Sequence, residues 1–481
     1  MDSKDTFDLV VIGAGTGGYS AALRGAELGL SVALVERAEL GGTCLNRGCI
    51  PTKALLHAAE LVEGTREGAE RWGIRATVEG IDYPKLAAAR DDIVAKNVNG
   101  LGSHLRGEGV TIVQGDARLA SPREVVIGDR RLTAAKAVLL ATGSVPAPFP
   151  GLTVDGTRIL TSDEALRLDH VPASAVVVGA GSVGVEFASL WNSLGTHVTL
   201  VEALPTLLPT EDSDLGRELA RVLKRKGIDV LAGAKVADVT VRDNGVRVTV
   251  ESGDDTRTVE AELLLSAIGR RPVTEGRGFE DTGVKLDRGY VVPADWDTLQ
   301  TDVDGVYAVG DILPPPSLAL AHASFAEGMR VAEHVAGAHH YPFDYSWVAR
   351  VTYSSPEVAA VGLTEEQARA GGGEVVVNRM PFSGVARGLM FGQGGFVKVV
   401  AEKGGEVLGI HMIGARVSEL VAEAMLIRGW SAGPDDVAYL IHPHPTLSEA
   451  VGEAHLTLAG RRLHQVVLKR AGSPQPAGAA G

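Results

Sequence analysis

Phe7-Asp-Leu-Val-Val-Ile12-Gly13-Ala-Gly15-Thr-Gly-Gly18 is the stretch that decides the fold. Its apolar first half predicts a short buried strand, and a glycine turn follows at once. Residues 19–28 have the composition of a helix, which Gly29 is expected to end. Residues 31–35 then form a second β-type run that ends at Glu36. Together these segments predict a compact βαβ unit.

The same pattern recurs later in the chain. The second copy has a strand, a glycine turn, a helix and a strand ending in an acid: 175–178, Gly179/Gly181/Gly184, 185–193 and 197–202. In such turns the first glycine permits the tight bend, the second lets backbone approach a pyrophosphate, and the third allows close helix packing. The helix N-terminus holds the phosphates, and an acid such as Glu36 or Glu202 binds ribose hydroxyls. Two copies therefore predict two bound dinucleotides.

Glu202 also bears on which nicotinamide cofactor binds. Sites for a 2′-phosphate normally supply arginines, but the next seven residues are Ala-Leu-Pro-Thr-Leu-Leu-Pro, and no basic side chain appears before Arg217. A carboxylate would repel the phosphate, so NAD(H) is favoured over NADP(H).

Size and charge limit the remaining possibilities. At 481 residues the chain is too long for one ordinary core, and usual domain sizes suggest about three domains. The net charge of −14 argues against a nucleic-acid partner. The longest uncharged stretches, such as Ala137–Val154, contain prolines and glycines and cannot form a clean spanning helix, and the charged N-terminus does not fit a signal peptide. We expect a soluble, cytoplasmic protein without a membrane partner.

The two cysteines, Cys44 and Cys49, lie close together. In the cytosol a close pair is catalytic, metal-binding or accidental, because structural thiols are kept reduced there. Five residues of regular helix separate two Cα atoms by roughly 8–9 Å, whereas a disulfide needs about 7 Å or less. A bond would require a distorted first turn, which Gly48 and Pro51 could provide. Zinc would need two further ligands at suitable spacing, so we predict no metal site and favour a redox disulfide over ordinary buried cysteines.

The segment from Gly41 to Lys53, GGTCLNRGCIPTK, resembles the redox-active segment of the pyridine nucleotide–disulfide oxidoreductases, and specifically of the dihydrolipoyl dehydrogenases. The likeness covers nearly the whole chain. Further matching motifs are Ala141-Thr-Gly143, Thr301 to Asp311, Leu320 to Ala323 with Glu327-Gly328, Tyr353 to Ala359, and His442 to Glu449. One departure is Arg47, where many members carry a small apolar residue; its charge could lower a thiol pKa or shape the substrate entrance.

The resemblance implies site residues and two cofactors, FAD and NAD. Catalytic roles fall on Cys44, Cys49, His444, Glu449, Lys53 and Glu186, with His444 as acid/base, Glu449 as its partner and His442 as a structural residue. FAD-binding roles fall on Gly13, Gly15, Gly18, Glu36, Lys53, Thr142, Gly143, Asp311, Ala319 and His322; NAD-binding roles fall on Gly179, Gly181, Gly184, Glu202 and Gly269. A dithiol substrate needs a base that titrates near neutrality, which suits a histidine.

The expected fold class is α/β, with two Rossmann-like nucleotide-binding domains and a C-terminal α+β dimerisation domain. We expect the boundaries 1–148 (FAD domain, first part), 149–272 (NAD domain), 273–345 (return to the FAD/central domain), 346–467 (dimerisation domain) and 468–481 (disordered tail). The Pro-Ala-Pro-Phe-Pro segment at 146–150 marks the first boundary, because it continues neither a helix nor a central strand.

The function implied by the resemblance is oxidation of protein-bound dihydrolipoamide by NAD⁺, through a Cys44–Cys49 disulfide and FAD, in a homodimer. The implied partner is the lipoylated acyltransferase of a 2-oxoacid dehydrogenase complex, or a glycine cleavage system. Glutathione-type reductases use NADPH, which the residues after Glu202 disfavour, and mercuric reductases usually have further cysteines. A mycothione-type reductase of another disulfide remains open. A non-enzymatic FAD-bound protein is the alternative of a different class, which absence of diaphorase activity would support.

Overall fold

The computed structural model describes residues 5–340 and 343–465, so the predicted tail at 468–481 lies outside the described residues. The chain forms two compact units, Met1–Ser355 and Pro356–Gly481, which are taken in turn. Within the described ranges no helix is long and apolar enough to cross a membrane.

The first βαβ unit builds a mostly parallel sheet, as predicted. Strands β1 (Thr6–Ile12), β2 (Val32–Glu36), β3 (Thr111–Gln114) and β6 (Arg130–Leu140) pair in the order β3-β2-β1-β6. The central strands are apolar along their length because the sheet is covered on both faces. Strand β19 (Val306–Ala308) comes from much later in the sequence and pairs in parallel with β6.

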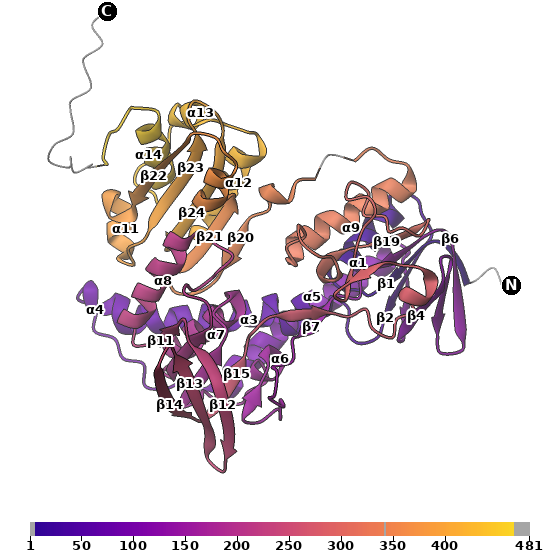
Figure 1. Cartoon of the computed structure of the whole chain (residues 1–481), viewed down its shortest axis with the longest axis horizontal. Coiled ribbons are helices and arrows are strands. Elements are labelled where there is room, and N and C mark those ends of the chain that lie inside the picture. Colours follow the sequence, from indigo (N-terminus) through magenta and orange to yellow (C-terminus); the bar gives the residue numbers. More distant parts are fainter. Residues whose placement is uncertain (1–4, 341–342, 466–481) are drawn as a thin grey trace, which may run out of the picture. The chain divides into compact units, whose positions relative to one another are not determined.

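Two helices pack closely against each other beside this sheet, α1 (Thr16–Glu27) and α9 (Ala321–Ala336), as Figure 1 shows. Their approach requires glycine, because a Cβ at Gly328 would lie 2.1 Å from the carbonyl oxygen of Gly17. At the other edge β4 (Ala117–Ser121) and β5 (Glu124–Ile127) form an antiparallel extension of β6. This agrees with the sheet predicted over residues 110–126.

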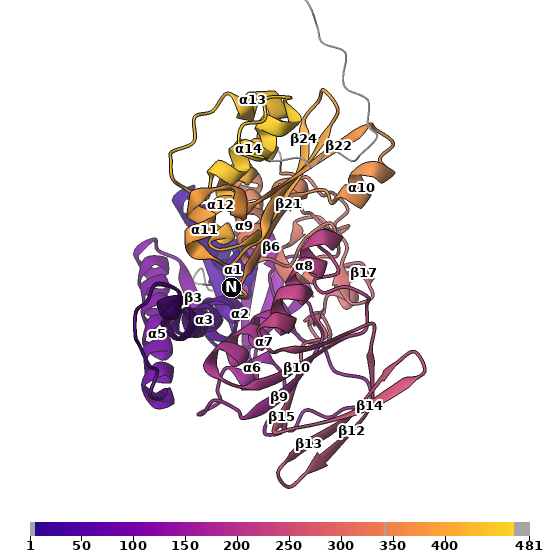
Figure 2. The same ribbon diagram turned by 90° about the vertical axis from the view of Figure 1, so that its left-hand side faces the viewer.

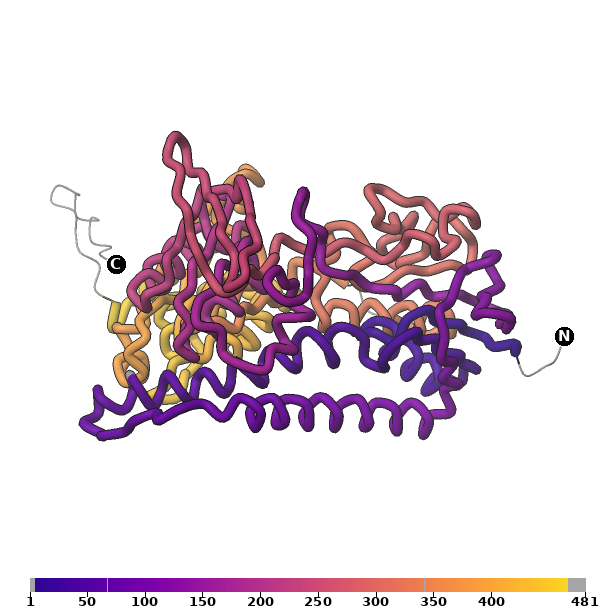
Figure 3. The backbone as a smooth tube through the Cα atoms, turned by 90° about the horizontal axis from the view of Figure 1, so that it is seen from below, coloured from indigo at the N-terminus to yellow at the C-terminus, as the bar shows by residue number. Residues whose placement is uncertain are grey.

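The redox segment lies in a helical region. Helix α2 (Gly42–Arg47) ends at Gly48, and α3 (Cys49–Glu63) begins directly after it, so the predicted distortion between the cysteines is confirmed. Helix α3 continues through a π turn at Gly64–Gly68 and α4 (Ala69–Arg71). The long helix α5 (Tyr83–Gly107) packs against α3, and Figure 3 shows the two running side by side.

The second βαβ unit forms its own parallel sheet, in the order β11-β10-β9-β15-β8. Its elements are β8 (Ile159–Leu160), α6 (Ser162–Ala165), β9 (Ser174–Val178), α7 (Ser182–Leu194), β10 (His197–Glu202), α8 (Ser213–Arg225), β11 (Asp229–Ala232) and β15 (Leu263–Ser266). An antiparallel sheet of β12 (Lys235–Arg242), β13 (Gly245–Ser252) and β14 (Asp255–Ala261) follows β11, and Figure 2 shows it beside the parallel sheet. The sequence interpretation did not include it.

Between the two parallel sheets the chain forms two short strands, β7 (Ser144–Pro146) and β16 (Arg270–Pro272), which pair antiparallel. They lie where the first and second domain boundaries were predicted. The remainder of this unit contains β17 (Leu286–Asp287), β18 (Tyr290–Val291), β20 (Arg350–Thr352) and 3₁₀ turns at Glu280–Thr282, Gly310–Ile312 and Tyr345–Trp347.

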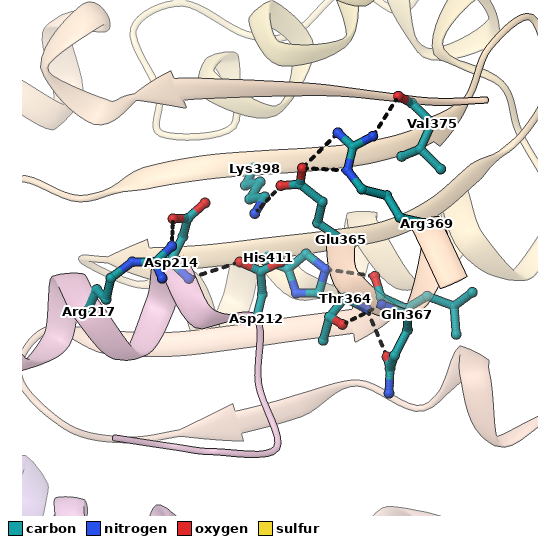
Figure 4. Close-up of polar contacts among 11 residues, drawn as sticks. Asp212, Asp214, Arg217, Thr364, Glu365, Gln367, Arg369, Val375, Lys398 and His411 are labelled. Carbon is teal, nitrogen blue, oxygen red and sulfur yellow. Dashed lines mark hydrogen bonds and ion pairs between the residues drawn. The ribbon is translucent and has the colours of Figure 1, made fainter. Parts of the chain in front are cut away.

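The second unit is α+β, as predicted. Strands β21 (Glu357–Gly362), β24 (Val407–Gly414), β23 (Phe396–Glu402) and β22 (Val375–Pro381) pair antiparallel in that order. The helices are α10 (Glu365–Ala370), α11 (Ala386–Phe391), α12 (Val417–Gly429), α13 (Pro434–Ala438) and α14 (Glu449–Leu458), with a 3₁₀ turn at Phe382–Gly384. Figure 4 shows Glu365 between Lys398, whose Nζ lies 2.8 Å away, and Arg369. This pairing satisfies a lysine that is otherwise buried in the sheet.

Candidate active site

The first glycine turn has the geometry that a dinucleotide site requires. Gly13 has φ +105°, and a Cβ at Gly18 would lie 1.8 Å from the carbonyl oxygen of Gly13, so helix and turn meet without side chains. Gly15 precedes α1 as its N-cap. The Glu36 carboxylate is buried and accepts hydrogen bonds from the backbone N–H groups of Ala14 and Ala38, both at 2.8 Å.

The second turn repeats this arrangement. Gly179 has φ +98°, and a Cβ at Gly184 would lie 1.8 Å from its carbonyl oxygen. Gly181 is the N-cap of α7. The Glu202 carboxylate accepts from the N–H groups of Ala180, at 2.7 Å, and Leu204, at 2.8 Å.

A cavity extends from the first turn. Five predicted cofactor residues line it: Gly13, Gly15, Glu36, Thr142 and Gly143. Glycine backbone, the α1 N-terminus and a ribose-binding acid fit an FAD dinucleotide. Other predicted FAD residues, namely Gly18, Lys53, Asp311, Ala319 and His322, do not line this cavity.

Asp311 is connected to the cavity through a residue that the sequence did not single out. It accepts a hydrogen bond from Ser144, which lines the cavity and in turn accepts from Arg270 at 2.7 Å. Burial raises the pKa of the Asp311 carboxyl above its ordinary value, although Ser144 and Arg270 act in the opposite direction. Ser144 and Arg270 lie far from Asp311 in the sequence, so no local motif could have indicated them.

Glu327 holds the segment that carries Asp311. It is fully buried and accepts hydrogen bonds from the Gly310 N–H at 2.7 Å, Ser317 Oγ at 2.9 Å and the Tyr345 hydroxyl at 2.7 Å. Because the first of these bonds fixes the residue before Asp311, Glu327 positions that carboxylate.

The other predicted cofactor residues have positive φ angles or contact backbone carbonyl oxygens. Ala319 has φ +49°, a left-handed conformation that is unusual for alanine and is found at functional sites. His322, in the first turn of α9, contacts the carbonyl of Ala349 through Nε2 at 2.7 Å. Gly269 has φ +130° and precedes β16, and Thr142 donates to the carbonyl of Val273 at 2.6 Å.

Cys44 and Cys49 are free thiols in this structure, so the disulfide itself stays a prediction. A hydrogen bond from Cys44 and the charge of Lys53 lower the pKa of Cys49 to about 7. Cys49 is also the first residue of α3, where the helix dipole favours a thiolate. The pair therefore contains one thiol that ionises near neutral pH beside one that remains protonated.

The structure brings Lys53 and Glu186 together, as predicted. Lys53 Nζ lies 2.7 and 2.9 Å from the two carboxylate oxygens. Burial opposes the charged form, but attraction to Glu186 raises the pKa of Lys53 above its ordinary value. Glu186 also accepts from the Tyr353 N–H at 2.9 Å, and Lys53 lies over the Tyr353 ring. The pair fixes a positive charge one helical turn after Cys49.

In the second unit, His444 and Glu449 form the predicted dyad. Nδ1 of His444 lies 2.8 Å from Oε1 of Glu449, whose other oxygen accepts from the Thr446 N–H. The His444 ring is 72% exposed, so Nε2 is accessible to a reactant. His442 is instead only partly buried, and its contact with Glu423 at 2.7 Å raises its pKa and agrees with a structural role. Across the described part of the chain, no group of side chains is arranged to hold a metal ion.

Two family models match the chain. One is the pyridine nucleotide-disulphide oxidoreductase model, over residues 7–328, and the other is the dimerisation domain of the same family, over residues 348–455. The chain belongs to the pyridine nucleotide-disulphide oxidoreductases. The α/β fold inferred from the sequence is thereby confirmed.

Relatives in this family match along nearly their whole length. The chain is 40% identical to a dihydrolipoyl dehydrogenase of Bacillus subtilis over 95% of this chain and 99% of that protein, and 42% identical to one of Thermus scotoductus with the same coverage. Among solved structures, LpdA of Mycobacterium tuberculosis superimposes with a TM-score of 0.85 at 29% identity, covering 94% of this chain and 99% of that one.

Proposed function

We propose that this chain is a dihydrolipoyl dehydrogenase, which oxidises a protein-bound dihydrolipoyl dithiol and reduces NAD⁺ with FAD as bound cofactor. The observation that carries the proposal is the Cys44–Cys49 pair, in which Cys49 has a pKa of about 7 beside the Lys53–Glu186 ion pair. Full-length relatives carry the same name, which supports the assignment.

In the proposed cycle the cysteines begin as a disulfide. His444 removes a proton from one substrate thiol, and the thiolate attacks the sulfur of Cys44, so that Cys49 leaves as a thiolate. The second substrate thiol then displaces Cys44, which releases the oxidised substrate and leaves two enzyme thiols. FAD supplies the two-electron route from these thiols to NAD⁺, and this restores the disulfide. Lys53 favours Cys49 as the leaving group, because its charge stabilises the thiolate.

The Glu449 carboxylate fixes the orientation of His444. Its contact with Nδ1 requires a proton on that nitrogen, so Nε2 is available as the base. Burial acts against ionisation, yet hydrogen bonds from His444 and Thr446 keep the pKa of Glu449 below its ordinary value. The orienting group therefore stays anionic through the pH range in which a histidine titrates.

We propose NAD binding at the second glycine turn and FAD binding at the first. The domain boundaries proposed from the sequence place these turns in 149–272 and 1–148. Glu202 supports NAD over NADP, because its carboxylate lies at the turn and Ala203 and Leu204 follow it.

A homodimer is proposed from the dimerisation domain and its surface. Trp430, Tyr439, Leu440 and Ile441 are large apolar residues with most of their surface exposed, and Ile441 reaches 97%. Such a patch marks an interaction surface, and it lies immediately before His442 and His444. We propose that burial of this patch between two copies places the His444–Glu449 dyad of each copy in the other's active site.

The proposed macromolecular partner is a lipoylated acyltransferase of a 2-oxoacid dehydrogenase complex, or the lipoyl protein of a glycine cleavage system, in the cytoplasm. The relatives' names and the disulfide chemistry support a lipoyl dithiol as substrate.

Anaerobic stopped-flow absorbance tests the function. Dihydrolipoamide should produce a rapid long-wavelength band from the Cys49 thiolate beside the flavin, and NAD⁺ should remove the band with formation of NADH. His444→Gln should slow only the first phase, by about a hundredfold or more, while His104→Gln, an exposed histidine paired with Glu108, should change neither phase. If NADH reduced the flavin but dihydrolipoamide did not change its spectrum, the assignment of dihydrolipoamide as substrate would be refuted. A different disulfide would then be the electron acceptor.

A further inference from the structure

Arg47 lies between the two cysteines, and the sequence suggested a role in thiol ionisation or at the substrate entrance. The structure directs it elsewhere. Arg47 lines the cavity together with Gly13 and Gly15, and the groups that shift the pKa of Cys49 are Cys44, Lys53 and Glu186. Its charge acts instead on Asp163, which lines the same cavity.

The placement of Arg47 follows from the helix that carries it. Thr43 and Arg47 are four residues apart on α2, so their side chains share one face, and both line the cavity. A helical side chain leans back toward the helix N-terminus, which directs the Arg47 guanidinium toward Gly42 and Thr43. Gly42 packs against Gly15, because a Cβ there would lie 2.8 Å from the Gly15 Cα. The guanidinium therefore lies on the side of the cavity where the first glycine turn receives phosphates.

The charges around Arg47 leave it available to an anion. Its ion-pair contact with Glu39 is long, at 3.5 Å, and the Glu39 side chain is 53% exposed, so the contact is weak and can be exchanged. Asp163, from α6, also lines the cavity, and its Oδ1 is buried without a hydrogen-bond partner. Burial raises the pKa of Asp163, while Arg270 and Arg47 act to lower it. A carboxylate in this position would repel a diphosphate unless a cation stood between the two.

We propose that Arg47 is a further cofactor-binding residue, whose guanidinium donates to the diphosphate of FAD and separates that diphosphate from Asp163. Arginine suits this place because its planar fork can contact phosphate oxygens while its charge offsets a neighbouring carboxylate. The inference rests on the proposed function, since it assumes that the first cavity binds FAD.

Fragments of the cofactor test the inference on apoprotein prepared from the full-length holoenzyme. ADP carries the diphosphate and riboflavin does not, so calorimetric titration with each reports which part of FAD a side chain holds. Loss of a charged hydrogen bond weakens binding by roughly ten- to a hundredfold. Arg47→Met should weaken the binding of ADP and of FAD by that factor and leave the affinity for riboflavin unchanged. The affinity for ADP should also depend less steeply on salt concentration than in the wild type. Arg47→Lys, which keeps the charge, should fall between Arg47→Met and the wild type.

Arg221→Met serves as the matched control, because Arg221 is exposed on α8, paired with Glu218 and outside the cavity. It should bind all three ligands like the wild type. Equal losses of ADP and riboflavin in Arg47→Met, or unchanged ADP binding, would overturn the inference while the proposed function stands. If the wild-type apoprotein bound neither FAD nor ADP, the proposed function itself would fail, and the inference with it.

Discussion

Replacing Lys53 with methionine should raise the pKa of the Cys49 thiol by about one unit. Lys53 is four residues after Cys49 on α3, a spacing that puts their side chains about 6 Å apart. A unit charge at that distance contributes about 3 kcal/mol at an effective dielectric constant near 20, or about two pKa units. Glu186, 2.7 Å from Lys53, cancels part of this charge. The thiol pKa, about 7 in the native protein, should therefore rise to about 8 in Lys53→Met.

The assay is a pH titration of the long-wavelength absorbance after anaerobic two-electron reduction, because that band requires the Cys49 thiolate. Glu186→Gln should shift the midpoint in the opposite direction, since its carboxylate raises the pKa of Cys49. Lys96→Met is the control, because Lys96 is exposed on α5 and paired with Asp92. A midpoint that is the same in Lys53→Met and the native protein would refute the electrostatic reasoning and leave the hydrogen bonds to Cys49 and the α3 N-terminus as the causes of its low pKa.

Three further outcomes are expected. Glu202→Ala should raise the KM for NAD⁺ about tenfold and reduce the preference for NAD⁺ over NADP⁺, because it removes the carboxylate proposed to bind the ribose; an unchanged ratio of kcat/KM for the two cofactors in steady-state kinetics would contradict this. Gly328→Ala should abolish stable FAD retention, because its Cβ would lie 2.1 Å from a backbone oxygen of α1, whereas Gly80→Ala, with open space around it, should behave like the native protein. The depressed pKa of Cys49 stabilises the folded dithiol form above the ordinary thiol pKa of about 9, and this contribution is lost as the pH falls through about 7; the melting temperature of the reduced protein should therefore rise over this range more than that of Cys49→Ser.

Local pattern was enough to predict both glycine turns, their flanking strands and the break between the cysteines. Each depends on residues within one supersecondary unit. Gly48 illustrates this. Two residues five apart in a regular helix lie farther apart than the Cα–Cα distance that a disulfide allows, so a bond between the cysteines requires the helix to be interrupted between them. The pairing of His444 with Glu449 was implied by the family resemblance rather than by local pattern, and the structure confirms their contact.

The missed features differ in kind. The antiparallel sheet carries a local signal that the sequence interpretation overlooked, because β13 alternates buried valines with polar residues from Val246 to Glu251. Ser144, Arg270 and Asp311 meet through tertiary contacts between β7, β16 and the turn at 310–312, and no short-range pattern records such contacts. The position of Arg47 on the cavity wall, rather than toward the thiols, likewise depends on where α2 lies.

Comparison of the two glycine turns within this one chain separates what the motif determines from what its surroundings determine. In both turns the acid at the strand end accepts two backbone N–H groups, from the residue after the first glycine and from the residue two positions after the acid. The carboxylate therefore fixes the turn before any ribose binds, and this shared geometry cannot distinguish one dinucleotide from another. The next residue differs, Arg37 beside Glu36 but Ala203 beside Glu202, and the wall of the first cavity carries Arg37, Arg47, Arg270 and Arg277. Four arginines suit a permanently held, doubly anionic diphosphate, whereas a turn flanked by alanine and leucine suits a cofactor that must leave after each cycle.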